Sequence, residues 1–406
     1  MGYPEYSALL CGIVLTILQN GAEWSKVFLE NRPVERQYKR YILNDLPKKM
    51  VFLTGPRQVG KTWLAKDIAG SFSDNAYLNY DSAEDREIIR QEAWLDTTKL
   101  LILDELHKMP GWKNYLKGVY DTKPDHLIIL VTGSARLEAF RQGGDSLAGR
   151  FFRHRLMPFS PAELSHVGVS VDPENLLAQG GFPEPFLAEN SVDADRWRMQ
   201  YIDGLIRTDI LDFERIHDFR AMQLLLDLLR SRTGSPVSNQ SIAEDIQIAP
   251  NTVKKYLQIL ESLYIIFRVH PFSRNIARSI LKEPKIYFFD TGLVKGDEGV
   301  KFENMTALCL LKHVYGLVDF QGRPYALHYL RTKEKKEVDF CIVNDDKPEL
   351  LIEVKRSDPK PTDALLYFTN KYGVPGMQLV LRLKREKKTK GIEIRRGMDY
   401  LKSLLI

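Results

Sequence analysis

A glycine-rich loop between a short apolar segment and a helical pattern is the feature that most restricts the fold of this chain. The apolar segment Met50–Thr54 predicts a buried strand, and Gly55–Thr62 (GPRQVGKT) follows it directly. A helical pattern then continues to Ala69. This is G-x-x-x-x-G-K-T in the strand, loop and helix context that a phosphate-binding loop requires. The sequence therefore predicts an α/β fold with a parallel sheet core and this loop at the end of a strand.

The residue types of the loop suit a nucleoside triphosphate and a divalent cation. Backbone N–H groups and the amino end of the helix supply partial positive charge for phosphate oxygens. We expect Lys61 to reach the β- and γ-phosphates and the Thr62 hydroxyl to bind Mg²⁺. We predict ATP and Mg²⁺ as cofactors. The predicted nucleotide-binding residues are Gly55, Pro56, Arg57, Gln58, Val59, Gly60, Lys61 and Thr62.

Two acids end the next apolar segment. Leu100–Leu103 predicts a strand, and Asp104 and Glu105 follow it. Because neighbouring strand residues point to opposite sides, we expect different roles for the two carboxylates. Asp104 would hold the Mg²⁺ shell, and Glu105 would polarise the attacking water as a general base. The alternative is a pair of solvated acids at a strand end.

A small hydroxyl follows a third apolar segment. Leu127–Val131 predicts a strand that ends in Thr132, Gly133 and Ser134. If this strand lies between the other two, Ser134 stands beside the γ-phosphate as a sensor. The alternative is an ordinary turn. Together with Lys61 and Glu105, Ser134 completes the catalytic residues that the residue patterns themselves predict.

Composition places the chain among ordinary globular proteins with several domains. Of its 406 residues, 44% are hydrophobic and 27% are charged. Three scattered cysteines are too few for a disulfide framework or a thiolate metal site, which favours a cytoplasmic setting. The apolar run Ala8–Leu18 is too short to span a bilayer, so we expect no membrane segment and a packed or oligomer-contacting helix there.

Positive charge is concentrated toward the carboxyl terminus. Residues 1–253 carry 29 basic and 34 acidic groups, whereas residues 254–406 carry 29 and 19. The densest stretch, Arg382–Arg396, holds eight basic residues and two acids. This asymmetry predicts contact with a polyanion, with a solvated basic face as the alternative.

The segment Ser238–Val269 predicts two helices around a short turn, followed by a strand. Ser238 or Asn239 can cap the first helix, Ile248–Pro250 forms the turn, and Asn251–Leu263 supplies the second helix. Lys254, Lys255 and Gln258 would remain outside, where a DNA recognition helix makes its contacts. Such modules also serve as protein-packing units, so both interpretations stay open.

A hairpin further along brings acids and a lysine together. Lys336–Val343 and Leu350–Lys355 alternate as strands, and a hairpin centred near Asp346 places Asp339 opposite Glu353. Lys355 lies two residues along on the same face. This predicts a second metal site of two carboxylates, with a lysine that positions water. Such a site either cuts nucleic acid or serves as a binding surface only.

Several segments spread along the chain form a combined pattern. They are YKRYIL (38–43), GPRQVGKT (55–62), LDELHKMPGW (103–112), VTGSA (131–135), SLAGR (146–150), PFSPAEL (158–164), GGFPEP (180–185), TVKKYLQILE (252–261), KIYFFDTGL (285–293), EVDF (337–340) and EVK (353–355). Together these segments resemble prokaryotic AAA+ ATPases that carry a C-terminal domain of unknown function related to PD-(D/E)xK nucleases. Residues 1–35 lie outside this resemblance.

The resemblance implies further roles. Arg150 could reach the γ-phosphate of a neighbouring subunit, with Arg153 as the nearest alternative and a structural salt bridge as the competing role. Such a finger implies a homo-oligomer, with a hexameric ring as the first expectation. Glu303, at the start of an apolar helical stretch, resembles an additional acid of the nuclease-like fold.

The resulting hypothesis is an ATPase that engages or remodels DNA. The competing hypotheses are a nucleotide-controlled signalling switch that binds a protein, and an ATP-gated nuclease. The predicted parts are an N-terminal extension (1–35), an AAA+ core (36–165), a helical connector (166–235), a winged helix-turn-helix (236–275) and a restriction-endonuclease-like α/β domain (276–406).

Overall fold

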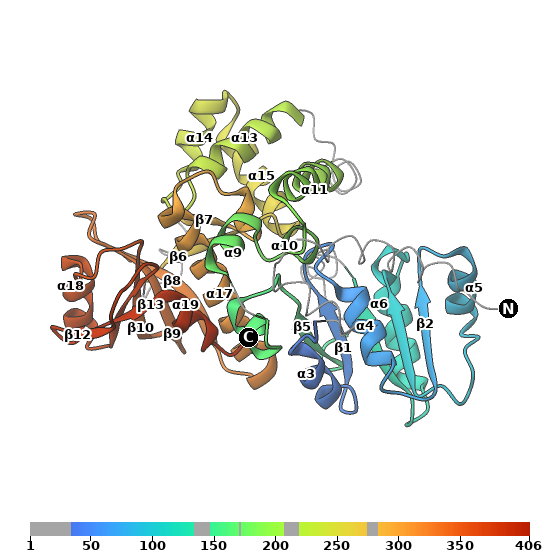
Figure 1. Cartoon of the computed structure of the whole chain (residues 1–406). Helices are drawn as coiled ribbons and strands as arrows, with labels where there is room; N and C mark the ends of the chain where they lie inside the picture. Colours follow the sequence, from blue (N-terminus) through green and yellow to red (C-terminus); the bar gives the residue numbers. More distant parts are fainter. Residues whose placement is uncertain (1–33, 134–146, 170–171, 207–218, 274–282) are drawn as a thin grey trace.

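The computed structural model describes residues 34–133, 147–169, 172–206, 219–273 and 283–406 (Figure 1). Two β-sheets form separate lobes, coloured blue to cyan and orange to red in Figure 1, and a group of helices lies between and above them. The predicted N-terminal helix at residues 8–18 falls outside the described residues. None of the helices in the described ranges has the length and apolar character that a bilayer crossing requires.

The first sheet has five parallel strands in the order β2-β3-β4-β1-β5. Every residue of β1 and β3 is buried, as expected for strands covered on both faces. The strand predicted at 127–131 does lie between the two others, as β4. The strands are β1 (Met50–Thr54), β2 (Asn75–Asn79), β3 (Leu100–Asp104), β4 (Ile128–Thr132) and β5 (Phe151–Arg155).

Helices cover both faces of this sheet. Alternation along β1 sends Val51 and Leu53 into one hydrophobic core and Met50 and Phe52 into another. The first core includes residues of α3 and α4, and the second includes residues of α5 and α6. The bounds are α3 (Tyr38–Asp45), α4 (Lys61–Ala69), α5 (Ala83–Gln91) and α6 (Trp112–Thr122), with a short 3₁₀ turn η2 (Leu106–Lys108).

The connecting region is helical. The predicted helix pair is present as α14 and α15: Ser238 caps α14 by accepting from the Ser241 N–H, and Pro250 opens α15. The helices are α8 (Pro161–His166), α9 (Pro173–Gln179), α10 (Pro183–Phe186), α11 (Ser191–Gly204), α13 (Phe219–Ser231), α14 (Asn239–Ile246) and α15 (Pro250–Ser262).

The second sheet has eight strands in the order β12-β13-β11-β10-β9-β8-β6-β7. It runs across the predicted boundary between residues 275 and 276, because β6 pairs with β8. The strands are β6 (Ile266–Pro271), β7 (Lys285–Phe288), β8 (Tyr325–Arg331), β9 (Glu337–Asn344), β10 (Lys347–Lys355), β11 (Gly376–Val380), β12 (Lys387–Thr389) and β13 (Ile392–Arg396). The 3₁₀ turn η5 (Thr291–Leu293) follows β7, and the helices α18 (Asp363–Tyr372) and α19 (Gly397–Lys402) belong to the same lobe.

The β9–β10 hairpin has a shorter turn than predicted. Asp345 and Asp346 both have positive φ (47° and 59°), which suits a tight two-residue turn. A register shift near Glu349 then aligns Leu350 with Ile342 and Ile352 with Phe340. Continued by one residue, this register places Glu353 opposite Asp339, as the predicted hairpin does.

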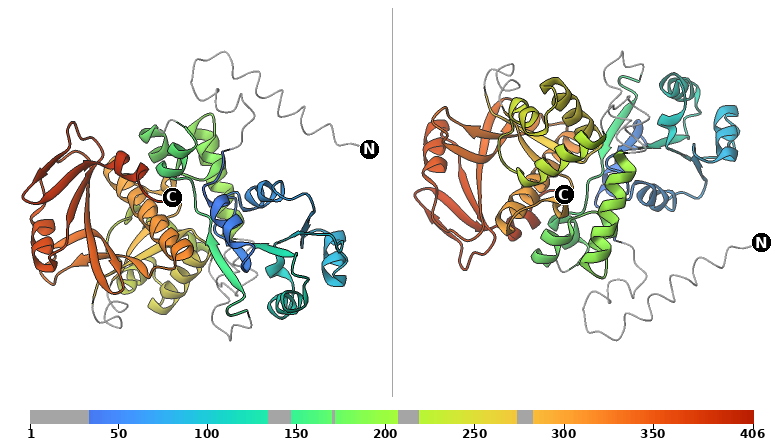
Figure 2. Two further views of the ribbon diagram at one scale, coloured as in Figure 1. Left: turned by 90° about the horizontal axis from the view of Figure 1, so that it is seen from below. Right: turned by 90° about the horizontal axis from the view of Figure 1, so that it is seen from above.

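One long helix, α17 (Glu298–Gln321), joins the two lobes. It contacts β5 of the first sheet and β8 and β10 of the second, and the left view of Figure 2 shows it between them. Glu303 directly precedes the apolar stretch of this helix, as predicted, and the helix itself begins earlier, at Glu298. The Asp297 side chain caps the helix by accepting from the Gly299 and Val300 N–H groups, so Glu303 lies in its second turn.

Candidate functional site

The loop after β1 has the backbone geometry of a phosphate cradle. Gly55 has a φ of 140°, and a Cβ atom there would lie 2.1 Å from the carbonyl oxygen of Leu156. Gly60, with a φ of 96°, is the N-cap of α4. Both positions therefore require glycine, one for close backbone approach and both for their positive φ. The loop ends at the amino terminus of α4, where free N–H groups attract anions.

Lys61 lies inside this loop. It is 7% exposed, and its ammonium donates to the carbonyl oxygens of Gly55 (3.1 Å) and Pro56 (2.5 Å). Burial lowers the pKa of Lys61 to about 8, although the carboxylates of Glu105 and Asp104 act in the opposite direction. The predicted phosphate-binding lysine therefore lies among the loop carbonyls and loses its proton at a lower pH than an exposed lysine does.

Asp104 accepts hydrogen bonds from three hydroxyl groups, one each on α4, β2 and β4. One of its oxygens accepts from Thr62 (2.9 Å) and from Tyr77 (2.6 Å), and the other accepts from Thr132. Hydroxyl and carboxylate oxygens are ligands that Mg²⁺ prefers, so the contact between Thr62 and Asp104 fits the predicted ion. Tyr77 was missed, because an aromatic residue in a strand gives no signal of a polar role.

Glu105 lies beside Asp104, but strand alternation is not the reason for its separate direction. The strand ends at Asp104, and Glu105 turns away with a φ of 56° while its N–H donates to the Thr132 carbonyl at 3.1 Å. Its carboxylate lies 3.4 Å from the Lys108 ammonium and 3.6 Å from His107 Nε2. The predicted general base is thus close to the loop and paired with a cation.

Two other predicted residues of this site have different outcomes. Ser134 lies outside the described residues. Arg150 immediately precedes β5, and its carbonyl accepts from the Met50 N–H at 3.2 Å. Because β1 and β5 run parallel, Arg150 lies near the amino ends of these strands, whereas the phosphate loop lies at the carboxyl end of β1. Its guanidinium donates to both carboxylate oxygens of Asp121 at 2.8 and 3.0 Å. Arg153 instead lies 3.8 Å from Asp319 on α17.

In the second sheet, acids surround a lysine that was not predicted. The Lys285 ammonium is buried and lies 2.8 Å from Glu337, 3.0 Å from Asp339 and 3.4 Å from Glu303. Burial disfavours its charge, yet the neighbouring acidic groups raise the pKa of Lys285 well above its ordinary value. Lys285 belongs to the segment KIYFFDTGL, whose apolar character gave no sign of a buried charge.

Glu353 and Lys355 stand beside this cluster. Their side chains form an ion pair at 2.7 Å, and Asp339 accepts from the Val354 N–H at 3.0 Å. Burial and then the Asp339 charge raise the pKa of Glu353 to about 8 and that of Glu303 to about 7. Asp339, Glu353, Lys355 and Glu303 are therefore brought together, and burial, followed by the Asp339 charge, favours the protonated forms of Glu353 and Glu303 near neutral pH.

The second metal site stays a prediction. Over residues 34–406, outside the gaps in the description, no three or more His, Cys, Asp and Glu side chains are placed to hold one metal ion together. The ammonium of Lys285 makes close contacts with two of the acids predicted for that site, Asp339 and Glu303.

Exposed basic side chains mark two further surfaces. Lys254, Lys255 and Gln258 lie on the exposed face of α15, while Val253 and Leu260 face the core. Around β12, five basic side chains are exposed, and no ion pair found in the described part of the chain involves them. They are Lys384, Arg385, Lys387, Lys388 and Lys390.

Three family models match successive parts of the chain, and the first of them covers most of the first lobe. Residues 47–165 match the family model described as AAA domain, residues 171–300 match a domain of unknown function (DUF8612), and residues 298–396 match another (DUF4143). The first lobe of the chain is therefore similar to AAA domains.

Relatives and solved structures similar to the chain are distant. An uncharacterized protein of Mycobacterium tuberculosis is 26% identical over 344 residues, which are 83% of this chain and 76% of the relative. One of Methanocaldococcus jannaschii is 22% identical over 366 residues, 80% of each chain. The Walker-type ATPase PABY2304 of Pyrococcus abyssi aligns with 64% of this chain and 95% of its own, at 15% identity and a TM-score of 0.44.

The pKa of Lys61 predicts a pH dependence of nucleotide binding. A bound phosphate stabilises the ammonium and raises its pKa, so affinity should fall as the pH rises through about 8. The decrease should reach at most about tenfold per pH unit. Calorimetric titration with ADP at pH 7 and pH 9, in two buffers of different ionisation enthalpy, should show proton uptake at the higher pH. Equal affinity at both values, without proton exchange, would contradict the prediction.

Proposed function

We propose that this protein binds and hydrolyses ATP in its first lobe and uses the nucleotide cycle to engage or remodel DNA through its basic carboxyl-terminal region. The observation that carries the ATPase part is the convergence of Lys61, Thr62, Asp104 and Glu105 where β1 and β3 end. The sheet order that puts β4 between these strands supports the same reaction.

The residues of the site divide the work of in-line water attack on the γ-phosphate. The loop N–H groups and Lys61 bind the phosphates and neutralise their charge. Thr62 and Asp104 would hold Mg²⁺, which supplies further charge neutralisation when bound. Glu105 orients the water and takes its proton, for which its carboxylate must leave Lys108. Tyr77 and Thr132 hold Asp104 in a fixed orientation.

Arg150 supports action between subunits. It lies at the edge of the sheet away from its own phosphate loop, so it can reach a γ-phosphate only on another copy of the chain. Its pair with Asp121 is on the surface, where such ion pairs contribute little stability and open readily. We therefore propose a homo-oligomer, with a hexameric ring as the arrangement to test first.

Substitution of Glu105 tests the ATPase mechanism. Glu105→Gln should bind ADP like the wild type and hydrolyse ATP at least about 100-fold more slowly, because the amide accepts no proton. Lys61→Ala should lose binding as well. Phosphate release and calorimetry measure the two quantities, and Glu84→Gln on α5 is a matched control.

Equal turnover by Glu105→Gln and the wild type would show that Glu105 is not the general base.

The same phosphate-release assay tests the proposal that Arg150 acts between subunits. Arg150→Ala should bind nucleotide without turnover and regain activity when it is mixed with Lys61→Ala, since each variant supplies what the other lacks. No recovery in the mixture would contradict action between subunits.

The DNA proposal is based on the distribution of exposed charge. The five basic side chains around β12 and the lysines of α15 stand on two modules that we assign as a nuclease-like fold and a winged helix. Phosphate contacts give an affinity that falls steeply with salt. The competing function, a switch that grips a protein partner, would leave DNA unbound even at low salt.

Neutralising the β12 lysines tests the DNA contact. Lys384, Lys387 and Lys388 changed to Gln should lower the slope of log affinity against log salt by up to about 3, one unit for each lost phosphate contact. Fluorescence anisotropy with a labelled duplex measures this slope. Lys48, Lys99 and Lys117 of the first lobe, changed to Gln together, are the control. An unchanged slope, or no binding by the wild type, would contradict the proposal.

We propose that the second lobe binds DNA without cutting it, because Lys285 occupies the centre of the acid cluster with its own positive charge. The wild type should leave plasmid DNA intact in the presence of Mg²⁺ or Mn²⁺, with or without ATP. Cleavage by the wild type that is lost in Asp339→Ala would instead establish an ATP-gated nuclease.

A further inference from the structure

A buried group of charged side chains lies directly behind the phosphate loop. Arg36 precedes α3 and is 2% exposed. Its guanidinium donates to the Val59 carbonyl oxygen of the loop (3.0 Å), to the Met157 carbonyl oxygen (2.5 Å) and to the Glu163 carboxylate (2.7 Å). Neither Arg36 nor Glu163 belongs to the nucleotide motif. One side chain thus connects the loop, the segment after β5 and a buried acid.

The contact with Val59 has a direct consequence for the loop. In a trans peptide the carbonyl and the following N–H point in opposite directions. Arg36 holds the Val59 carbonyl to one side, so the Gly60 N–H is directed to the other, where a phosphate-binding loop presents its N–H groups. A second carbonyl, that of Arg57, accepts from the Tyr201 hydroxyl at 3.4 Å. Two outside donors therefore set the orientation of the loop peptides.

Glu163 also forms an ion pair with a lysine of α17, the helix that joins the two lobes. Lys312 of α17 is 1% exposed, and its ammonium contacts Glu163, the Pro158 carbonyl oxygen (2.9 Å) and Ser160 Oγ (3.1 Å). Burial would raise the pKa of Glu163, but the charges of Arg36 and Lys312 lower it below its ordinary value. The two cations are thus joined through one ionised acid.

The same face of α17 makes a second contact with the first lobe. Tyr315 and Asp319 lie three and seven residues after Lys312, which places all three on one side of the helix. Asp319 accepts from Arg155 of β5 at 2.7 and 2.8 Å, and the Arg155 guanidinium lies over the Tyr315 ring. Toward its other end, α17 carries Glu303 of the acid cluster. The helix therefore has fixed contacts at both sites.

We infer that Arg36 is a positioning residue of the phosphate loop and that the Glu163–Lys312 pair couples the state of this loop to α17 and the second sheet. This inference rests on the proposed function, because it requires that the loop bind nucleotide. A loop that closes around phosphates shifts the Val59 carbonyl, and Arg36 transmits that shift to the carboxylate shared with Lys312.

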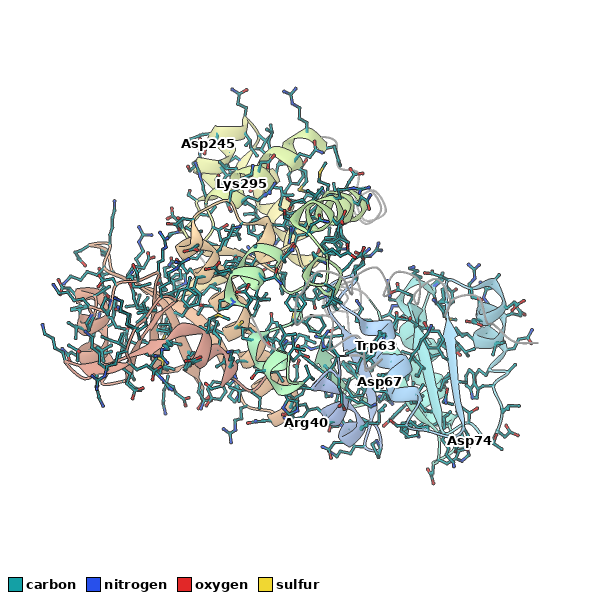
Figure 3. All side chains as sticks on the ribbon, in the orientation of Figure 1. Arg40, Trp63, Asp67, Asp74, Asp245 and Lys295 are labelled. Carbon is teal, nitrogen blue, oxygen red and sulfur yellow. The ribbon has the colours of Figure 1, made fainter. Side chains whose placement is uncertain are left out.

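The test compares nucleotide affinity with stability in the full chain. Arg36→Lys keeps a charge for Glu163 but loses the planar fork that reaches Val59 at the same time. It should weaken ADP binding about tenfold or more, the effect of one lost hydrogen bond to a charged group, and raise KM for ATP with a smaller change in kcat. It should still fold, with a melting temperature only a few degrees below that of Arg40→Lys, the same change at an exposed position of α3 (Figure 3), since one buried acceptor loses its partner.

Lys312→Met tests the coupling, since Lys312 does not touch the loop. It should raise the dissociation constant for ADP severalfold, whereas Lys301→Met on the same helix should not. The double variant Arg36→Lys with Lys312→Met should lose less affinity than the product of the single effects, because both act through Glu163. Unchanged affinity in Arg36→Lys, or independent effects in the double variant, would overturn the inference.

The controls separate this inference from the proposed function. If the wild type binds no ADP, the proposed function fails. If the wild type binds ADP and Arg36→Lys binds it equally well, only the present inference fails. Should Arg36→Lys not fold, Glu163→Gln supplies the same comparison, because it removes the charge that orients Arg36 and leaves every loop residue in place.

Discussion

The close approach of Gly55 to the chain after β5 is the constraint on which the first lobe depends. The Leu156 N–H donates to the Thr54 carbonyl at 2.8 Å, and the Leu156 carbonyl fills the space where a side chain on Gly55 would stand. The bend that begins the phosphate loop is therefore packed against the segment leading to Met157 and Glu163. Loop geometry and the path of this segment are set together, which explains why one buried arginine can contact both.

The sequence predicts well wherever the signal is local. The strand and helix that flank Gly55–Thr62, the position of β4 and the helix pair α14–α15 all depend on apolar periodicity and caps within a few residues. The position of Asp339 opposite Glu353 could also be predicted from the sequence, because the position of the turn fixes the register of a hairpin. Near the turn the prediction was less accurate, since a bulge at Glu349 leaves no mark in the alternation of polar and apolar residues.

The missing parts are long-range polar contacts. Arg36 and Glu163 are separated by 127 residues and Glu163 and Lys312 by 149, so no periodicity links them. Lys285 falls in an apolar strand, where a single lysine looks like an edge residue rather than the centre of an acid cluster. Glu105 was assigned a direction from strand alternation, but its positive φ shows that the strand had already ended.

The 24 residues of α17 extend for roughly 36 Å at 1.5 Å per residue. Because this helix is packed on the second sheet and ion-paired with β5, neither lobe has a complete surface without the other. A fragment that ended with the AAA-type domain would lack α17. The apolar surface of the first lobe that α17 covers would then be exposed to water, and Arg155 would lose its ion pair with Asp319. The two lobes are thus better regarded as one folding unit that shares α17 than as two independent domains joined by a linker.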